Sequence, residues 1–503
     1  MQTEAAAQRL VNALQAHLQA RTGQAVELHE THISWVLLAG RLAYKLKKPV
    51  RLPFLDFSTP ALRKHFCEEE VRLNRRLAGP LYLGVEPVCG TAQAPRIGGA
   101  GPVIDHVVCM QRFPAGALLS ERLAAGRLQP PDLDQLAQRL ADFHQAAEPA
   151  PQGRAVPVAQ PVRDVLDQLG DGDPAQLAGL RAWVQQQARH LQPTWEARRR
   201  AGAVRECHGD LHLANAVKLD REVMAFDCIE FDPALRWTDV MSDVAFLSMD
   251  LLAHGRGDLA FRFLDAYLQR SGDYAGVPVL RFQQVYRALV RALVGHLRAA
   301  SGGPNYLACA QSLAQPAAGG ARLLITHGLS GSGKSSLAGQ LLEAAGAVRV
   351  RSDVERKRLF GLTALQPSGA RAPQVYSAEA TQRTNERLRE CAGQALQAGY
   401  PVIVDATFLR RAERRTFQDW AAALRVPFAI LHCRAGEAVL RRRVAARGAG
   451  GSDASEATVA VLEQQLAQQE PLADDERGCV LEAATDAPVD VGTLWARWRA
   501  MAA

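Results

Sequence analysis

Residues 328–335 form a glycine-rich segment with the pattern GxxxxGK[ST], and no other part of the sequence limits the possible folds of this chain as strongly. It follows the apolar run LLITH and precedes the helical run SSLAGQLLEAA. Glycines let backbone N–H groups curl around phosphate oxygens, and the helix N-terminus adds partial positive charge. Lysines are only seven of the 59 basic residues, which argues against a chance match. The predicted nucleotide-binding residues are Gly328, Leu329, Ser330, Gly331, Ser332, Gly333, Lys334, Ser335 and Ser336.

Within this segment, Lys334 is predicted to reach the β- and γ-phosphates and Ser335 to ligate Mg²⁺. A second magnesium ligand is expected at Asp405, which ends the apolar strand Pro401–Asp405. Many strands end in Asp as a helix cap or turn residue, but about 70 residues after a phosphate-binding loop a magnesium ligand is favoured.

Three further residues are candidates for phosphoryl transfer in the second half. Asp353 closes the strand AVRVRSD and is proposed as the base or orienter for an acceptor hydroxyl; capping of the next helix is the alternative. Arg443 and Arg447 lie one helical turn apart and could neutralise charge on the γ-phosphate from a closing lid. A solvated basic helix face is their alternative interpretation.

Strands and helices alternate through the second half, with one helix expected over 378–398, and this predicts a parallel α/β sheet. With the segment VIVDATF and the lid helix, residues 322–475 resemble the small P-loop kinases, the group of polynucleotide 5′-kinases and zeta-toxin-like kinases. The resemblance implies ATP- or GTP-dependent phosphorylation of a hydroxyl and leaves the acceptor open.

The first half carries a different set of chemical residues. The sequence CHGDLHLAN contains HxDxxxxN, and Asp227 follows twelve residues after Asn215. Asp210 can accept the proton of an acceptor hydroxyl, while Asn215 and Asp227 can each hold a Mg²⁺ that bridges nucleotide phosphates. His208 is expected to brace the loop.

Phosphate contact in the first half is assigned to a lysine. Lys45 ends the strand LAYK and is preferred over Lys47, which the two-residue strand period places on the same face. Its partner is expected on the helix over 59–78, where Glu70 is preferred and Glu68 and Glu69 are alternatives.

HGDLHLAN and FDCIEFD resemble the aminoglycoside phosphotransferase/choline-kinase-like branch of the protein-kinase fold. Nearly the whole chain resembles bacterial proteins that fuse such a domain to a P-loop kinase. The fold class expected is therefore a protein-kinase-like α+β domain, with a small β lobe and a large helical lobe, plus an α/β P-loop domain. One departure is the absence of GxGxxG before Lys45; HETHIS is the candidate phosphate loop.

The Gly- and Pro-containing stretch 299–320 predicts the boundary between domains at 1–315 and 320–503. Nine scattered cysteines and the lack of a long apolar run predict a cytoplasmic protein without a membrane segment. The net charge of +7 over 503 residues is mild and does not indicate nucleic-acid binding.

The leading hypothesis is a phosphotransferase with two nucleotide sites, each using Mg²⁺ and ATP, with GTP as the alternative nucleotide. Its acceptors are expected to be small hydroxyl-bearing molecules. The acidic stretch 227–250 favours a cationic acceptor, unless its aspartates serve as helix caps. One alternative is a metabolite sensor that gates a P-loop ATPase, and another is a nucleic-acid 5′-kinase.

Overall fold

The computed structural model describes residues 4–52, 55–151, 158–170, 174–297, 302–316, 319–450 and 453–502. The chain forms two compact units. Unit 1 is Met1–Val156 with Gly202–Asp243, and unit 2 is Pro157–Ala201 with Val244–Ala503. The domain boundary expected between 315 and 320 thus falls inside unit 2, and it stays a prediction about the two sequence modules.

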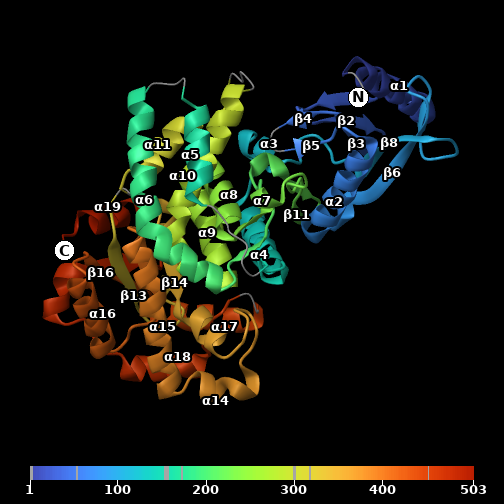
Figure 1. Cartoon of the computed structure of the whole chain (residues 1–503). Coiled ribbons are helices and arrows are strands. Elements are labelled where there is room, and N and C mark those ends of the chain that lie inside the picture. Colours follow the sequence, from blue (N-terminus) through green and yellow to red (C-terminus); the bar gives the residue numbers. More distant parts are fainter. Residues whose placement is uncertain are drawn as a thin grey trace. The chain divides into compact units, whose positions relative to one another are not determined.

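Unit 1 contains a six-stranded antiparallel sheet in the order β1-β2-β3-β8-β6-β7. Figure 1 labels β2, β3, β6 and β8 of this sheet. Its strands are β1 (Glu27–Glu30), β2 (Ser34–Ala39), β3 (Leu42–Lys47), β6 (Tyr82–Gly90), β7 (Pro95–Ile97) and β8 (Val103–Gln111). The short strands β4 (Arg51–Leu52) and β5 (Leu55–Asp56) pair with each other.

Two helices cover the two faces of this sheet. Along β3, Tyr44 and Leu46 join the core with α1 (Glu4–Thr22). Successive side chains of a strand point to opposite faces, so Lys45 and Lys47 point to the face covered by α2 (Pro60–Ala78). This alternation turns two lysines toward the helix that carries the glutamates.

The remainder of unit 1 comprises two helices that follow the sheet and the segment that contains HGDLHLAN. Its elements are α3 (Leu119–Ala124), α4 (Pro130–Ala146), β9 (Val204–Glu206), β10 (Ala216–Leu219), β11 (Glu222–Ala225), α7 (Pro233–Arg236) and β12 (Trp237–Asp239). Strands β9 and β12 pair, as do β10 and β11, both antiparallel. The loop between β9 and β10 is therefore fixed at both ends.

Unit 2 contains a helical part and a sheet part. The helices of the first are α5 (Ala159–Gln168), α6 (Pro174–Arg200), α8 (Met241–Ala253, which begins in unit 1), α9 (Gly257–Ser271), α10 (Val277–Leu297) and α11 (Tyr306–Ala314). None of the described helices is both long enough and apolar enough to cross a membrane.

The sheet part of unit 2 has five strands in the order β14-β15-β13-β16-β17, with every neighbouring pair parallel. They are β13 (Arg322–His327), β14 (Val348–Arg351), β15 (Pro401–Asp405), β16 (Phe428–Arg434) and β17 (Val480–Ala484). The helices around the sheet are α12 (Lys334–Ala345), α13 (Ser352–Leu359), α14 (Ala372–Val375), α15 (Ala378–Gln397), α16 (Arg411–Ala423), α17 (Glu437–Gly450), α18 (Val459–Gln468) and α19 (Val491–Ala500). The predicted α/β fold with a parallel sheet is confirmed.

Candidate functional sites

Lys45 on β3 lies between two carboxylates. Its Nζ is 2.8 Å from Glu70 Oε1 and 2.7 Å from Asp227 Oδ1. Burial by itself lowers the pKa of Lys45, but Asp227 and Glu70 outweigh it and hold the pKa well above its ordinary value. The ammonium group therefore stays charged at the place where α2 and the segment after β11 meet the sheet.

Lys47 occupies the same face two residues later and is 1% exposed. Its Nζ donates to Glu70 Oε2 at 2.7 Å and also to Glu230. Both candidate lysines thus reach Glu70, while Lys45 reaches Asp227 and Lys47 reaches Glu230. The sequence analysis did not identify Glu230 as a partner of a lysine, although Glu230 lies within the segment FDCIEFD.

The two alternative glutamates on α2 point elsewhere. Glu68 lies 3.7 Å from Lys64, with both side chains more than half exposed. Glu69 accepts from Arg72 and lies 3.4 Å from Arg236. Of the three glutamates in this run, the structure places Glu70 against Lys45.

The candidate phosphate loop HETHIS is the turn between β1 and β2. The Thr31 hydroxyl accepts from the Ser34 amide at 3.0 Å, and the Thr31 amide donates to the Ser34 carbonyl at 2.8 Å. A Thr/Ser turn thus closes this hairpin without glycine.

Asp210, Asn215 and Asp227 gather at the loop after β9. Asn215 Nδ2 donates to both Asp210 Oδ2 and the Asp210 carbonyl, each at 3.0 Å. Asp227 has φ +65°, and its amide donates to the Tyr82 hydroxyl at 3.2 Å. Burial by itself raises the pKa of Asp227, but Lys45 outweighs it, so the net pKa lies below its ordinary value. Two of the predicted residues are hydrogen-bonded, and the third is held by Lys45.

His208 braces this loop from the inside. Its Nε2 lies 2.9 Å from the Phe226 carbonyl, and its Nδ1 accepts from the Asp210 amide at 3.2 Å. These two contacts require a proton on Nε2 and a lone pair on Nδ1. Burial lowers the pKa of His208, which is consistent with a neutral ring.

Asp243 on α8 anchors the same loop. Its carboxylate accepts from the His208 amide at 2.8 Å and from the Gly209 amide at 2.9 Å. Sequence reasoning did not single it out, because its one signal was membership of the acidic stretch 227–250. Asp232 caps α7 by accepting from the Ala234 amide, as the helix-cap alternative expects, and Asp239 accepts from the Met241 amide at the start of α8.

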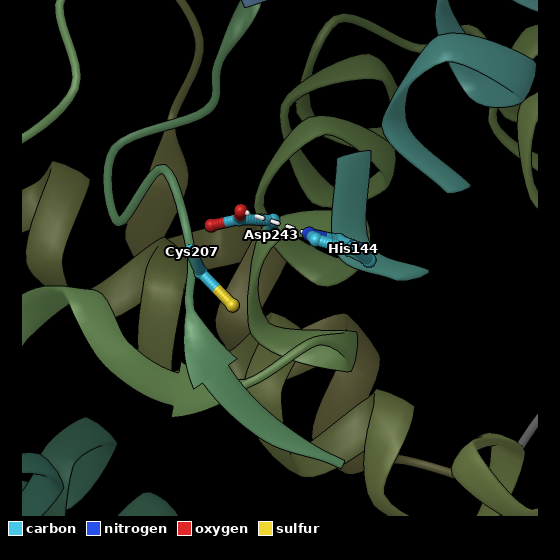
Figure 2. Close-up of side chains that lie close together, drawn as sticks. All are labelled: His144, Cys207 and Asp243. Atoms are coloured by element: carbon cyan, nitrogen blue, oxygen red, sulfur yellow. Dashed lines mark hydrogen bonds and ion pairs between the residues drawn. The ribbon is translucent and has the colours of Figure 1, made fainter. Parts of the chain in front are cut away.

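Asp243 also belongs to a buried group with His144 and Cys207, whose potential ligand atoms lie within 4.8 Å of one another (Figure 2). His144 Nε2 is 3.2 Å from Asp243, whereas Cys207 Sγ is directed to the Thr238 carbonyl at 3.4 Å. Burial raises the pKa of Asp243, but hydrogen bonding and charge from His144 outweigh it and lower the pKa to about 2. Because Asp243 already accepts three hydrogen bonds, the group acts as a loop anchor.

The glycine-rich segment in unit 2 has the backbone of a phosphate-binding loop. It joins β13 to α12, which begins at Lys334. Gly328, Gly331 and Gly333 have φ of +145°, +82° and +80°. A Cβ at Gly328 would lie 2.4 Å from the Cys433 carbonyl oxygen, so a side chain there would have to displace backbone. The predicted strand–loop–helix context is confirmed.

Lys334 and Ser332 lie inside this loop. Lys334 Nζ donates to the Leu329 carbonyl at 2.8 Å. The Ser332 hydroxyl is buried and has no hydrogen-bond partner within the described part of the chain. A buried hydroxyl without a partner is costly, and a phosphate oxygen in the loop would remove that cost.

Asp405 ends β15, the strand next to β13, and is 4% exposed. Its Oδ2 has no hydrogen-bond partner among the described residues; Arg351 Nε lies 3.5 Å away and Arg349 Nη1 3.9 Å away. Two residues after Asp405, the Thr407 carbonyl accepts from the Gly328 amide at 3.2 Å. A buried carboxylate oxygen at the phosphate-binding loop fits a magnesium ligand.

Of the three other predicted residues of unit 2, the structure shows one in contact with this loop. Asp353 is in the first turn of α13, half-buried, and does not cap that helix, whose N-cap is Arg351. Arg443 donates to the Thr485 carbonyl at 2.8 Å and to the Gly331 carbonyl at 3.3 Å, so it contacts the loop backbone. The side chain of Arg447 lies outside the described residues.

Comparison with known proteins gives one family model and full-length relatives. A model described as an AAA domain matches residues 323–472. "Uncharacterized protein Rv2004c" of Mycobacterium tuberculosis is 33% identical over 499 residues, which cover 94% of this chain and 95% of the relative. "Uncharacterized protein Mb2027c" of Mycobacterium bovis gives the same values. The match to the AAA domain agrees with the predicted P-loop module.

Among solved structures, the chain is similar to a choline/ethanolamine kinase family protein from Mesorhizobium loti. The identity is 15% and the TM-score 0.38, over 60% of this chain and 92% of the other. It is also similar to a gluconokinase from Sinorhizobium meliloti, with 20% identity and a TM-score of 0.26 over 36% of this chain and 90% of the other.

Proposed function

The chain belongs to the same family as these mycobacterial proteins, and we propose that it is an ATP-dependent phosphotransferase with two nucleotide sites, one in each unit. The observation that carries the proposal in unit 1 is the contact of Lys45 Nζ with Glu70 at 2.8 Å and with Asp227 at 2.7 Å. In unit 2 it is the glycine loop that ends at Lys334 on the first residue of α12. The acceptors are small hydroxyl-bearing molecules, GTP is the alternative nucleotide, and the location is cytoplasmic.

In unit 1, Lys45 would contact the α- and β-phosphates while Glu70 holds its ammonium in place. Asp210, 38% exposed in its side chain, would accept the proton of the acceptor hydroxyl. Asn215 and Asp227 would hold Mg²⁺, which supplies positive charge to the phosphate oxygens when bound. The neutral His208 keeps the Asp210 backbone in place by accepting its amide hydrogen.

In unit 2, the amides of residues 328–335 and the Lys334 ammonium would bind the phosphates. Ser335 and Asp405 would hold Mg²⁺, and Asp353 would accept the acceptor proton. Arg443 is positioned to stiffen the loop through Gly331 and Thr485. We propose Arg447 as a second lid arginine on α17, one turn after Arg443.

The test measures ATP consumption with panels of sugars, amino alcohols, aminoglycosides and oligonucleotides. It compares the wild-type chain with Asp210→Ala, Lys334→Ala and the double variant. Two independent sites predict that each single variant loses phosphorylation of one acceptor class and that the double variant loses both. Lys64→Met, at an exposed ion pair on α2, is the matched control and should retain both activities.

The other outcomes decide between the alternatives. Activity that survives Asp210→Ala but disappears in Lys334→Ala, with ligand binding retained in unit 1, would favour a sensor that gates a P-loop ATPase. Phosphate transfer to oligonucleotide 5′-ends would favour nucleic-acid repair. Unchanged ATP consumption in the double variant would overturn the proposal.

A further inference from the structure

Helix α9 packs on the P-loop part of unit 2, although it lies outside residues 323–472 that match the AAA domain. The Phe261 ring would be 3.0 Å from a Cβ at Gly346, just after α12. The same ring meets Tyr400 edge to face, with 6.2 Å between centroids. At the rim, Arg262 pairs with Glu343 of α12 at 2.9 Å. This contact has an apolar centre and a partly exposed charged edge.

A buried ion pair lies in the same contact. Asp265 of α9 and Arg349 of β14 are 7% and 8% exposed. Arg349 Nη2 donates to Asp265 Oδ2 at 2.7 Å, and Arg349 Nε donates to Oδ1 at 3.2 Å. A two-pronged geometry of this kind fixes the guanidinium plane as well as its charge.

The remaining nitrogen of Arg349 faces the P-loop site. Nη1 donates to the Ser335 carbonyl at 2.9 Å, in the first turn of α12. It also lies 3.9 Å from Asp405 Oδ2, beyond hydrogen-bond distance. Arg351 Nε lies 3.5 Å from the same oxygen, but Arg351 donates through Nη2 to Asp453 at 2.7 Å, so its charge has a closer carboxylate partner, as that of Arg349 has in Asp265. Arg349 is therefore shared between a carboxylate on α9, the backbone of the P-loop helix and the carboxylate at the end of β15.

The partners of Arg349 matter because a buried cation is stable only when it pairs with a nearby carboxylate. With Asp265 in place, Arg349 is neutralised on the side away from Asp405. Without that charge, Asp405 becomes its remaining carboxylate partner at short range. An arginine paired tightly to Asp405 would compete with a divalent cation for the same oxygens.

We propose that Asp265 is a positioning residue for the P-loop site: it holds Arg349 against the Ser335 carbonyl and leaves the Asp405 carboxylate to Mg²⁺. The inference rests on the proposed function of that site. It makes a helix from outside the AAA domain part of the magnesium site, and it links the two sequence modules through two side chains.

The experiment measures binding of a fluorescent ATP analogue to the full-length chain, once with excess Mg²⁺ and once in EDTA. Subtracting the signal of the Lys334→Ala variant isolates the P-loop site. Asp265→Asn should reduce the gain in affinity due to Mg²⁺ about tenfold and change the affinity in EDTA by less than twofold. A helix that only supports the fold would weaken both affinities together.

Two further variants sharpen the test. Glu343→Gln removes the rim ion pair of the same contact and should leave the Mg²⁺ gain unchanged. Asp265→Asn combined with Arg349→Gln removes both charges, so the Mg²⁺ gain should return to the wild-type value. If Asp265→Asn does not fold, Asp265→Ser takes its place: a reduced Mg²⁺ gain with unchanged affinity in EDTA supports the proposal, and a Mg²⁺ gain within twofold of wild type contradicts it.

The results separate this inference from the proposed function. A wild-type chain whose P-loop site shows no Mg²⁺-dependent nucleotide binding would end both. Normal Mg²⁺-dependent binding in wild type and in Asp265→Asn would end this inference and leave the function standing. A double variant as impaired as Asp265→Asn would likewise show that Arg349 does not compete for Asp405.

Discussion

Lys47 puts a second ammonium group into the interior of unit 1 beside Glu70 and Glu230, which are 0% and 4% exposed. Replacement of Lys47 by methionine keeps the apolar stem of the side chain but removes its charge. Lys45 is then the ammonium group that remains beside three carboxylates, those of Glu70, Glu230 and Asp227. Removing one partner of a buried ion pair costs about 3–5 kcal/mol, because the remaining charge stays desolvated. We expect Lys47→Met to lower the free energy of unfolding by about 3 kcal/mol in urea titrations.

The matched comparison is Lys64→Met on α2, whose partner Glu68 is more than half exposed. Exposed ion pairs contribute little to the free energy of unfolding, so Lys64→Met should unfold at nearly the wild-type urea concentration. Equal losses from both replacements would contradict the view that Lys47 is a buried structural cation.

Asp243 gives a pH prediction with a defined sign. Its folded pKa is about 2, below its ordinary value, so its stabilising effect is complete above about pH 4. The effect is lost as the pH falls from about 4 to 2, since the carboxylate then takes up a proton in the folded state as well. Asp243→Asn should be less stable by roughly 2 kcal/mol at pH 7. Urea titrations from pH 7 to 2 should show this deficit shrinking below pH 4; a deficit that stays constant would contradict it.

At the scale of elements, the loop before α12 depends on a glycine that has no room for a side chain. At Gly328, φ is +145° and a Cβ would lie 2.4 Å from a backbone carbonyl oxygen. Gly328→Ala should therefore distort the loop and weaken nucleotide binding at the P-loop site more than tenfold. Calorimetric titration with an ATP analogue measures the change.

Gly361 provides the control for this substitution. It also has a positive φ, +70°, but a Cβ there would meet no atom within 4 Å. Gly361→Ala should cost about 1 kcal/mol of stability through backbone strain and leave nucleotide affinity unchanged. A similar loss of affinity in both variants would mean that general strain, not the shape of the loop, controls binding.

Elements with local signals were predictable from the sequence. The helix expected over 378–398 is α15 (Ala378–Gln397), and the one over 59–78 is α2, which Thr59 caps. Both helices have an N-cap side chain and a periodic apolar face. These two signals depend only on residues that are close together in the sequence. The phosphate-binding loop was predictable for the same reason.

Apart from the Lys45–Glu70 pair, long-range partners were not predictable. Asp243 meets the amides of His208 and Gly209 across 34–35 residues, and Asp265 meets Arg349 across 84. No spacing rule connects such residues, because the contact depends on how separate elements pack. The same holds for Glu230, whose partner Lys47 is 183 residues away.

At the scale of the whole molecule, the sequence modules and the compact units divide the chain differently. The sequence favours a break at 315–320, where small residues separate a helical region from the strand β13. In the structure, the helices of 244–316 belong to the unit that holds the P-loop sheet. The reason is that α9 packs against α12 and β14. The local composition of the chain gives no sign of this contact.

This division predicts that the P-loop module is less stable when cut at the module boundary. A fragment of residues 320–503 loses α9, so Gly346 and Tyr400 lose the Phe261 ring and Arg349 loses Asp265. A loss of about 2–3 kcal/mol lowers Tm by roughly 5–10 °C for a chain of this size. A fragment of residues 244–503 keeps α9 and should melt higher by that amount in circular dichroism scans. If both fragments melt at the same temperature, α9 adds nothing to the stability of the P-loop module, and the chain divides where its sequence modules meet.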